Sequence, residues 1–171
     1  MRPARTLLAT IALLAATVTA APQGAPMFGG FLAQSNEPIR IDASSLERTL
    51  RDGREVLEYS GNVVARRGDM VIRASVLTVL LPAPGGPGGA FERITATGNV
   101  SVISGAQNAT ANNAVMDMVR RTIIMTGDVS LADGTNQMSG QTLTIDLATG
   151  GWLLETGANQ RVVTVINPPA R

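Results

Sequence analysis

Side chains that carry out chemistry in enzymes are scarce in this chain. It contains no histidine and no cysteine, which excludes His-assisted serine or cysteine hydrolysis, thiolate zinc sites and histidine-based metal centres. The glycine-rich stretch 85–89 lacks the lysine and the Ser or Thr of a phosphate-binding loop. We therefore expect a protein that is not an enzyme and that uses no cofactor or metal ion.

Paired carboxylates are the remaining candidates for acid–base chemistry. Asp117 and Asp146 occupy nearly matching positions in two related segments, and each lies between two apolar residues. In an extended strand, successive side chains point to opposite faces. The apolar neighbours would face inward, so we expect both carboxylates to point outward into solvent.

The two aspartates belong to a sequence repeat. The corner sequences "SGN" at Ser60, "TGN" at Thr97 and "TGD" at Thr126 begin three copies, and "TG" at Thr156 begins an incomplete fourth. These corners lie 37, 29 and 30 residues apart. The long first interval contains "PAPGGPGG", Pro82 to Gly89, and without these eight residues it shortens to 29. This stretch is therefore predicted to be a surface loop inserted into a regular repeat.

Apolar and polar residues alternate with a period of two along most of the chain, which indicates β-strands. The [ST]-G-[ND] corners suit a backbone with positive φ and would separate short strands. In "DASSLERTLRDG", from Asp42, a spacing of four also allows a helix, but we favour strand–turn–strand because the neighbouring units are hairpins. The expected strands are residues 54–59, 62–67, 69–80, 91–96, 99–104, 108–118, 121–126, 128–132, 137–147, 151–155 and 161–166.

Such strands can close into a barrel, stack as a sandwich or coil as an open roll. Because each two-strand copy turns the chain in the same way, we favour an all-β, solenoid-like or jelly-roll stack that grows along one axis. Its inner face would carry Ile, Val, Leu and Met, since the chain has only three Phe, one Tyr and one Trp. Met116 and Met118 would lie on this face, where flexible thioethers can fill a core or accommodate acyl chains, and we favour the core.

The N-terminal segment has the composition of an export signal. Arg2 and Arg5 precede an apolar run from Leu7 to Val18 and a cluster of small residues. This pattern predicts a cleaved secretory signal peptide over residues 1–20. An uncleaved membrane anchor is the alternative, although the apolar run is shorter than the roughly 20 residues of a spanning helix.

The rest of the chain is nearly neutral. Residues 21–36 are rich in Gly, Pro, Ala and Gln without a period, so we expect a flexible leader before a domain at 37–168. The exported part has 12 basic and 13 acidic residues, a net charge of −1. This balance does not favour nucleic-acid binding, and Arg66-Arg67 and Arg120-Arg121 are typical of solvated turns. Without cysteine, neither a disulfide nor an acylated anchor is available.

Several segments of the domain resemble the LptA/OstA family of periplasmic lipopolysaccharide-transport proteins. They are "EPIRIDA", "LEYSGNVVARRGDMVIRASVLTVLL", "ITATGNVSV", "TIIMTGDVSL", "MSGQTLTIDL" and "RVVTVINP". The resemblance covers residues 37–168. Its most specific elements are the P-I-x-I strand from Pro38, the Y-S-G-N-V corner from Tyr59 and the ordered succession of T-G-[ND] corners.

The resemblance implies an open, twisted β-jelly roll with a hydrophobic groove along its length. Members of the family accept lipopolysaccharide from the inner-membrane partner LptC and pass it towards the outer-membrane protein LptD, shielding the acyl chains from water. The family often has an aromatic residue where this chain has Ile103 or Met116. The lipid contacts expected here are Ile39, Ile41, Val63, Val79, Leu81, Val102, Ile103, Met116, Met118, Val129, Ile145 and Leu147.

An open roll also has two edge strands whose backbone groups invite a partner strand. We expect one edge near Pro38–Asp42 and the other near Arg161–Ile166, with Pro168-Pro169 ending the last strand. The expected assembly is a head-to-tail homo-oligomer whose ends dock LptC-like and LptD-like partners. Two other interpretations stay open: a membrane-anchored, LptC-like member of the same fold, and a structural β-repeat protein of the envelope with a filled core and no lipid.

Overall fold

The computed structural model describes residues 37–87, 89–134, 136–158 and 160–166. These residues form ten strands and no helix. The strands are β1 (Arg40–Asp42), β2 (Ser45–Arg51), β3 (Arg54–Arg67), β4 (Met70–Leu80), β5 (Arg93–Ser104), β6 (Gln107–Asp117), β7 (Thr122–Asp133), β8 (Asn136–Asp146), β9 (Trp152–Glu155) and β10 (Val163–Val165). The expected signal peptide at 1–20, the leader at 21–36 and the Pro168-Pro169 stop lie outside the described residues.

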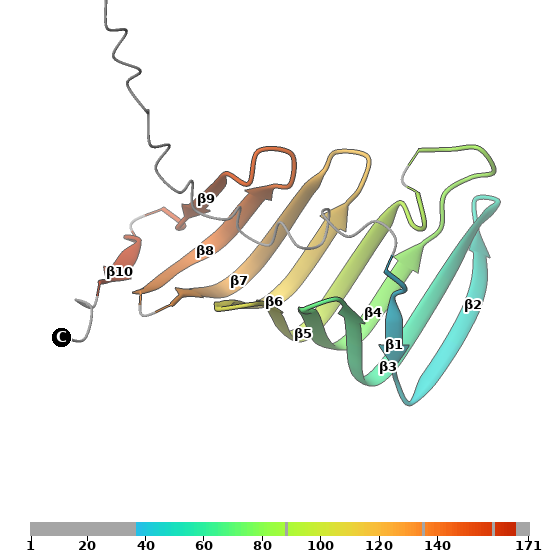
Figure 1. Cartoon of the computed structure of the whole chain (residues 1–171), viewed down its shortest axis with the longest axis horizontal. Coiled ribbons are helices and arrows are strands. Elements are labelled where there is room, and N and C mark those ends of the chain that lie inside the picture. The colour runs from blue at the N-terminus through green and yellow to red at the C-terminus, as the bar shows by residue number, and fades with distance from the viewer. Residues whose placement is uncertain (1–36, 88, 135, 159, 167–171) are drawn as a thin grey trace, which may run out of the picture.

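All ten strands belong to one antiparallel sheet. Its order is β1-β3-β4-β5-β6-β7-β8-β10, with β2 also on β3 and β9 also on β8. Figure 1 shows the strands side by side along the long axis, with β1 and β2 at one end and β9 and β10 at the other. The all-β prediction is confirmed. The ambiguous segment after Asp42 is strand β2, as favoured, and it pairs with β3 across the Asp52-Gly53 turn.

The repeated corners bend strands without ending them. Gly61, Gly98 and Gly127 have φ of +82°, +79° and +82°, and the next residue is also left-handed in each case, with φ of +50°, +50° and +48°. At these points the pairing register shifts, as in a β-bulge, and then continues on the same neighbouring strand. The expected positive φ is therefore confirmed, but the prediction of separate strands at 54–59 and 62–67, and at the two later corners, was wrong.

A side chain packs over each of these glycines, from the bend between β1 and β2 at Gly61 and from the neighbouring strand at Gly98 and Gly127. A Cβ added at Gly98 would lie 2.7 Å from Ser75 Oγ, and one at Gly127 would lie 2.7 Å from Asn112 Nδ2. Ser75 also donates a hydrogen bond from its Oγ to the Gly98 carbonyl (3.2 Å). Glycine is thus needed here both for its φ and for the close approach of the next strand.

The bends divide the sheet into two limbs. Each limb contains eight strand segments, because the six long strands contribute one segment to each limb. Limb 1 consists of β2, β9 and the parts of the long strands at 54–60, 76–80, 93–97, 113–117, 122–126 and 142–146. Limb 2 consists of β1, β10 and the parts at 63–67, 70–73, 100–104, 107–110, 129–133 and 136–140.

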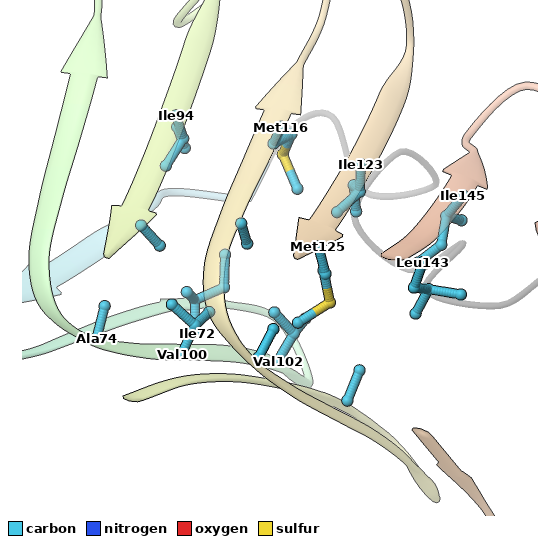
Figure 2. Close-up of a cluster of buried hydrophobic side chains, with 14 of the residues drawn as sticks. Ile72, Ala74, Ile94, Val100, Val102, Met116, Ile123, Met125, Leu143 and Ile145 are labelled. Atoms are coloured by element: carbon cyan, nitrogen blue, oxygen red, sulfur yellow. The ribbon is translucent and has the colours of Figure 1, made fainter. Parts of the chain in front are cut away.

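The hydrophobic core lies between the two limbs. Figure 2 shows Ile94, Met116 and Ile123 of limb 1 and Val100 and Val102 of limb 2 directed into this shared space. All five belong to one cluster of buried residues. The limbs therefore hold each other by burying apolar side chains, in the manner of an open, folded-over sheet.

The insertion at Pro82–Gly89 falls where the repeat predicted it. β4 ends at Leu80 and β5 begins at Arg93, and the described residues between them are outside the strands. The base of this connection is fixed, because Leu81 N–H donates to the Glu55 carbonyl (3.0 Å) and Glu92 N–H donates to the Leu80 carbonyl (2.9 Å). It forms the large green loop of Figure 1.

Candidate functional site

Rows of apolar side chains cross the inner faces of both limbs. Residues opposite each other in an antiparallel ladder share a face. In limb 1 such a row consists of Leu57, Val79, Ile94, Met116, Ile123 and Ile145. In limb 2 it consists of Ile41, Ala65, Ile72, Val102, Ala109 and Leu131. The two rows face one interior that runs across the strands, along the long axis of the roll.

Eleven of the twelve residues predicted from the sequence to contact lipid lie in this interior. The fully buried ones are Val63, Val79, Val102, Met116, Val129, Ile145 and Leu147. The partly buried ones, packed against the same cluster, are Ile39, Ile41, Leu81 and Met118.

Ile103 is the exception and lies on the outer face. It follows Val102, which is 3% exposed in the interior, and successive strand residues point to opposite sides. Its partners in the ladder are Val71 and Asn108. The prediction that Ile103 and Val102 share the groove was wrong, because the alternation of the strand permits only one of them to face inward.

At the N-terminal end the interior opens into a pocket of about 350 Å³. Its walls are mostly apolar and come from β1 and the residues before it, from β3, β4 and β5, and from the loop before β5. The lining residues are Glu37, Pro38, Ile39, Ile41, Tyr59, Arg67, Val79, Ala90, Phe91 and Ile94. A mostly apolar concave site with a few polar groups is typical of ligand binding.

Further along the roll the interior is closed. Met125, Leu131, Leu143 and Ile145 are 0% exposed, and they come from β7 and β8 of both limbs. Such packing leaves no space for a ligand in this conformation. Of the residues expected to contact lipid, Ile39, Ile41 and Val79 line the N-terminal pocket, whereas Ile145 lies in this closed part.

Sequence reasoning missed the two aromatic residues of the pocket. Tyr59 was used only as part of a corner motif, and Phe91 was used only as the first residue of an expected strand at 91–96. Phe91 is 3% exposed. The available signal was a bulky apolar residue shortly after a proline- and glycine-rich loop.

The carboxylate prediction was half wrong. Asp117 points to the outer face but is buried (6% exposed), because Arg120 N–H donates to its Oδ1 (2.9 Å) and Arg93 Nη2 donates to its Oδ2 (2.8 Å). These two donors hold the pKa of Asp117 below its ordinary value. Asp117 is buried because it contacts Arg93 on another strand and Arg120 in a turn. The alternation of apolar and polar residues along its own strand does not predict these contacts.

Asp146 is exposed, as expected, and closes a turn. The N–H groups of Ala148 (2.7 Å) and Thr149 (3.2 Å) donate to its Oδ1 and keep its pKa below the ordinary value. Both aspartates thus hold their own strand ends in place. Within the described ranges, no group of three or more acidic side chains could hold a metal ion.

The edge strands at the two ends of the roll could pair with a partner. The predicted edges are strands β1 and β10, and each shares its end with a further edge strand, β2 or β9, that sequence reasoning had not assigned to an edge. On β1, Asp42 accepts hydrogen bonds from Arg40 and Arg66. Large exposed apolar residues at the two ends are Leu46, Leu50, Trp152, Leu153, Val162, Val163, Val165 and Ile166.

The part of the chain with assigned structure contains no helix that is long and apolar enough to cross a membrane.

These features define an open β-jelly-roll protein with an apolar interior. The chain belongs to the LptA/(LptD N-terminal domain) LPS transport protein family, whose model matches residues 40–151. This finding confirms the resemblance seen in the sequence.

Two further similarities agree with this assignment. An uncharacterised protein of Rhizobium meliloti (strain 1021) is 30% identical over 147 residues, which cover 83% of this chain and 77% of the relative. The crystal structure of LptH from Pseudomonas aeruginosa, the LptA-homologous periplasmic component of a lipopolysaccharide transport device, has a TM-score of 0.65. It is 18% identical, with 79% of this chain and 99% of that chain covered, so the similarity confirms the fold.

Proposed function

We propose that this protein is a periplasmic bridge component that binds lipopolysaccharide, shields its acyl chains in the interior of the roll and passes the lipid from the inner to the outer membrane. The observation that carries the proposal is the apolar interior shared by the two limbs, with its N-terminal end open as a pocket. Membership of a family of lipopolysaccharide transport proteins supports the choice of ligand.

The physical requirement for such a carrier is a long apolar surface. Each acyl methylene exposed to water costs about 0.8 kcal/mol, so a lipid with several chains crosses an aqueous space only inside a continuous apolar trough. The rows on the two limbs supply such a surface from Ile41 and Leu57 at one end to Leu131 and Ile145 at the other. Binding along the whole length requires the limbs to separate in the closed part.

The edges of the roll support docking at both ends. Because each limb has an even number of antiparallel strands, β9 runs opposite to β2, and β10 runs opposite to β1. A second copy added end to end would therefore continue both limbs as antiparallel sheet, with its interior in line with the first. We infer head-to-tail oligomers, with an LptC-like protein at one end and an LptD-like protein at the other. Sedimentation across a concentration series tests self-association.

A second candidate is a structural envelope protein without lipid. The closed packing around Leu143 and Ile145, both 0% exposed, favours it. A membrane-anchored, LptC-like protein is a third candidate, and N-terminal sequencing of the exported protein separates it from the bridge. An intact Met1 supports the anchor, whereas a start after residue 20 supports export by a cleaved signal peptide.

Lipopolysaccharide binding by two matched variants tests the proposal. Ile41→Asp places a carboxylate in the pocket, where it stays hydrated but opposes acyl chains, and Ile103→Asp places one on the outer face. We expect the Ile41 variant to bind at least tenfold less lipopolysaccharide and the Ile103 variant to bind as the wild type does. Circular dichroism verifies that both are folded. If the wild-type protein binds no lipopolysaccharide, the bridge is excluded in favour of the structural candidate.

A further inference from the structure

The N-terminal pocket has a wall that the repeat does not provide. Phe91 belongs to the connection between β4 and β5, which contains the eight-residue insertion. The corresponding connections at 118–121 and 147–151 are short and contain no aromatic residue. Phe91 therefore gives this end of the interior a shape that the other repeats lack.

Phe91 is held firmly in this position. The next residue, Glu92, forms an ion pair with Arg54, and its N–H donates to the Leu80 carbonyl (2.9 Å). The Phe91 side chain is 3% exposed and belongs to the same buried cluster as Val79 and Ile94. A ring fixed between the anchored end of a loop and the core acts as a wall, because it has little freedom to move aside.

The size of the pocket matches one hydrocarbon chain. At about 30 Å³ per heavy atom, the volume of a water molecule in the liquid, a space of about 350 Å³ holds on the order of ten carbon atoms. The apolar lining by Ile39, Ile41 and Tyr59 suits a chain rather than a sugar. A lipid with several acyl chains does not fit, so only one chain enters before the limbs separate.

We propose that this pocket receives a single unbranched acyl chain of lipopolysaccharide and that Phe91 sets the length of chain that it accepts. The inference rests on the proposed function and adds to it the place of first entry and a residue that determines chain-length specificity. Affinity for chains should rise about fourfold per methylene while apolar surface is still being buried. It should level off once the chain reaches Phe91.

The two fluorescent residues of the domain make the test specific for position. Tyr59 lines the pocket, whereas Trp152 lies on β9 at the other end, and the chain contains no other Tyr or Trp. In the Trp152→Phe variant, fatty acids of increasing length with a terminal bromine should quench Tyr59. In the Tyr59→Phe variant, the same probes should leave Trp152 emission unchanged. Quenching of Trp152 with Tyr59 unaffected would overturn the proposal.

Shortening the wall tests the specificity role. Phe91→Ala and the milder Phe91→Leu, each in the Trp152→Phe background, should move the plateau of affinity to chains longer by two or three methylenes. Phe91→Leu keeps the site apolar if the alanine variant fails to fold. An unchanged plateau in a folded variant would show that Phe91 does not limit the pocket.

Competition separates this inference from the proposed function. Lipopolysaccharide should displace the brominated probe, and phosphatidylethanolamine and unlabelled fatty acid are the other competitors. If lipopolysaccharide binds the protein in co-sedimentation but leaves the probe in place, the entry site is wrong while the transport function stands. If lipopolysaccharide binds in neither assay while fatty acids fill the pocket, the proposed function itself fails, and this inference with it.

Discussion

The N-terminal end of the interior and its part around β7 and β8 are built from the same repeat but are packed differently. Around Tyr59 and Phe91 the limbs leave a pocket of about 350 Å³. Around Leu143 and Ile145, both 0% exposed, they leave none. The repeat thus supplies an apolar inner face, and the loop between β4 and β5 adds Ala90 and Phe91 to the wall of the pocket at one end.

Because of this difference in packing, one region stabilises the fold and the other can accept a ligand. A fully buried aliphatic side chain stabilises the fold by about 1.5–3 kcal/mol, so the closed region around β7 and β8 holds the limbs together. Lipid that spreads into this region must replace those contacts with its own acyl chains. The open end can accept a chain without that loss, and it therefore suits first contact with the ligand.

A carboxylate placed in each region tests the difference in packing between them. Leu143→Asp buries a charge in the closed part and should lower the free energy of unfolding by roughly 4 kcal/mol or more. Ile41→Asp, at a partly buried position that lines the open pocket, should leave a folded and soluble protein because the carboxylate stays hydrated. Thermal melting followed by circular dichroism measures both. Equal losses would contradict the division into a closed and an open region.

Acid should weaken the middle of the roll more than its N-terminal edge. The pKa of Asp117 is lowered by Arg120 N–H and Arg93, so its contribution to stability is present above the ordinary pKa and is lost as pH falls through the folded-state value. Asp117→Asn should cost about 1–2 kcal/mol at neutral pH and should flatten the stability profile in acid. Asp42→Asn, at the exposed β1 edge, should have a smaller effect. Denaturant titrations between pH 2 and 7, an interval chosen to span the ordinary carboxyl pKa, compare them.

The smallest effect is expected from the tip of the insertion. Deleting residues 84–88 changes the closure entropy of the loop by about 1 kcal/mol or less and leaves Phe91 and its anchor at Glu92 in place. Stability and lipopolysaccharide binding should both be preserved. Loss of binding in a folded deletion variant would mean that the tip, as well as Phe91, forms part of the site.

The sequence predicts most of this fold because its signals are local. Alternation indicates strands, and the T-G-[ND] corners require the positive φ found at Gly98 and Gly127. The same signal cannot distinguish a bend within a strand from a turn between strands, since both use left-handed residues. The long strands were therefore predicted as pairs of short ones.

The errors in the candidate site arise from contacts that are not local. Asp117 is buried by Arg93, which lies 24 residues away in the sequence. Phe91 was expected to begin a strand, but it enters the interior from the connection between β4 and β5. Ile103 is different, because strict alternation with Val102 would have placed it outside; its assignment followed the family resemblance instead.

Site-specific photocrosslinking tests whether lipopolysaccharide lies in the interior of the roll. A photoreactive residue is introduced in place of Ile41 in the open pocket, of Met118 further along the interior, or of Ile103 on the outer face, and exported protein is irradiated in cells. The lipid-carrying interior predicts crosslinks from positions 41 and 118 and none from 103. Crosslinks of equal yield from all three positions, or only from 103, would contradict it.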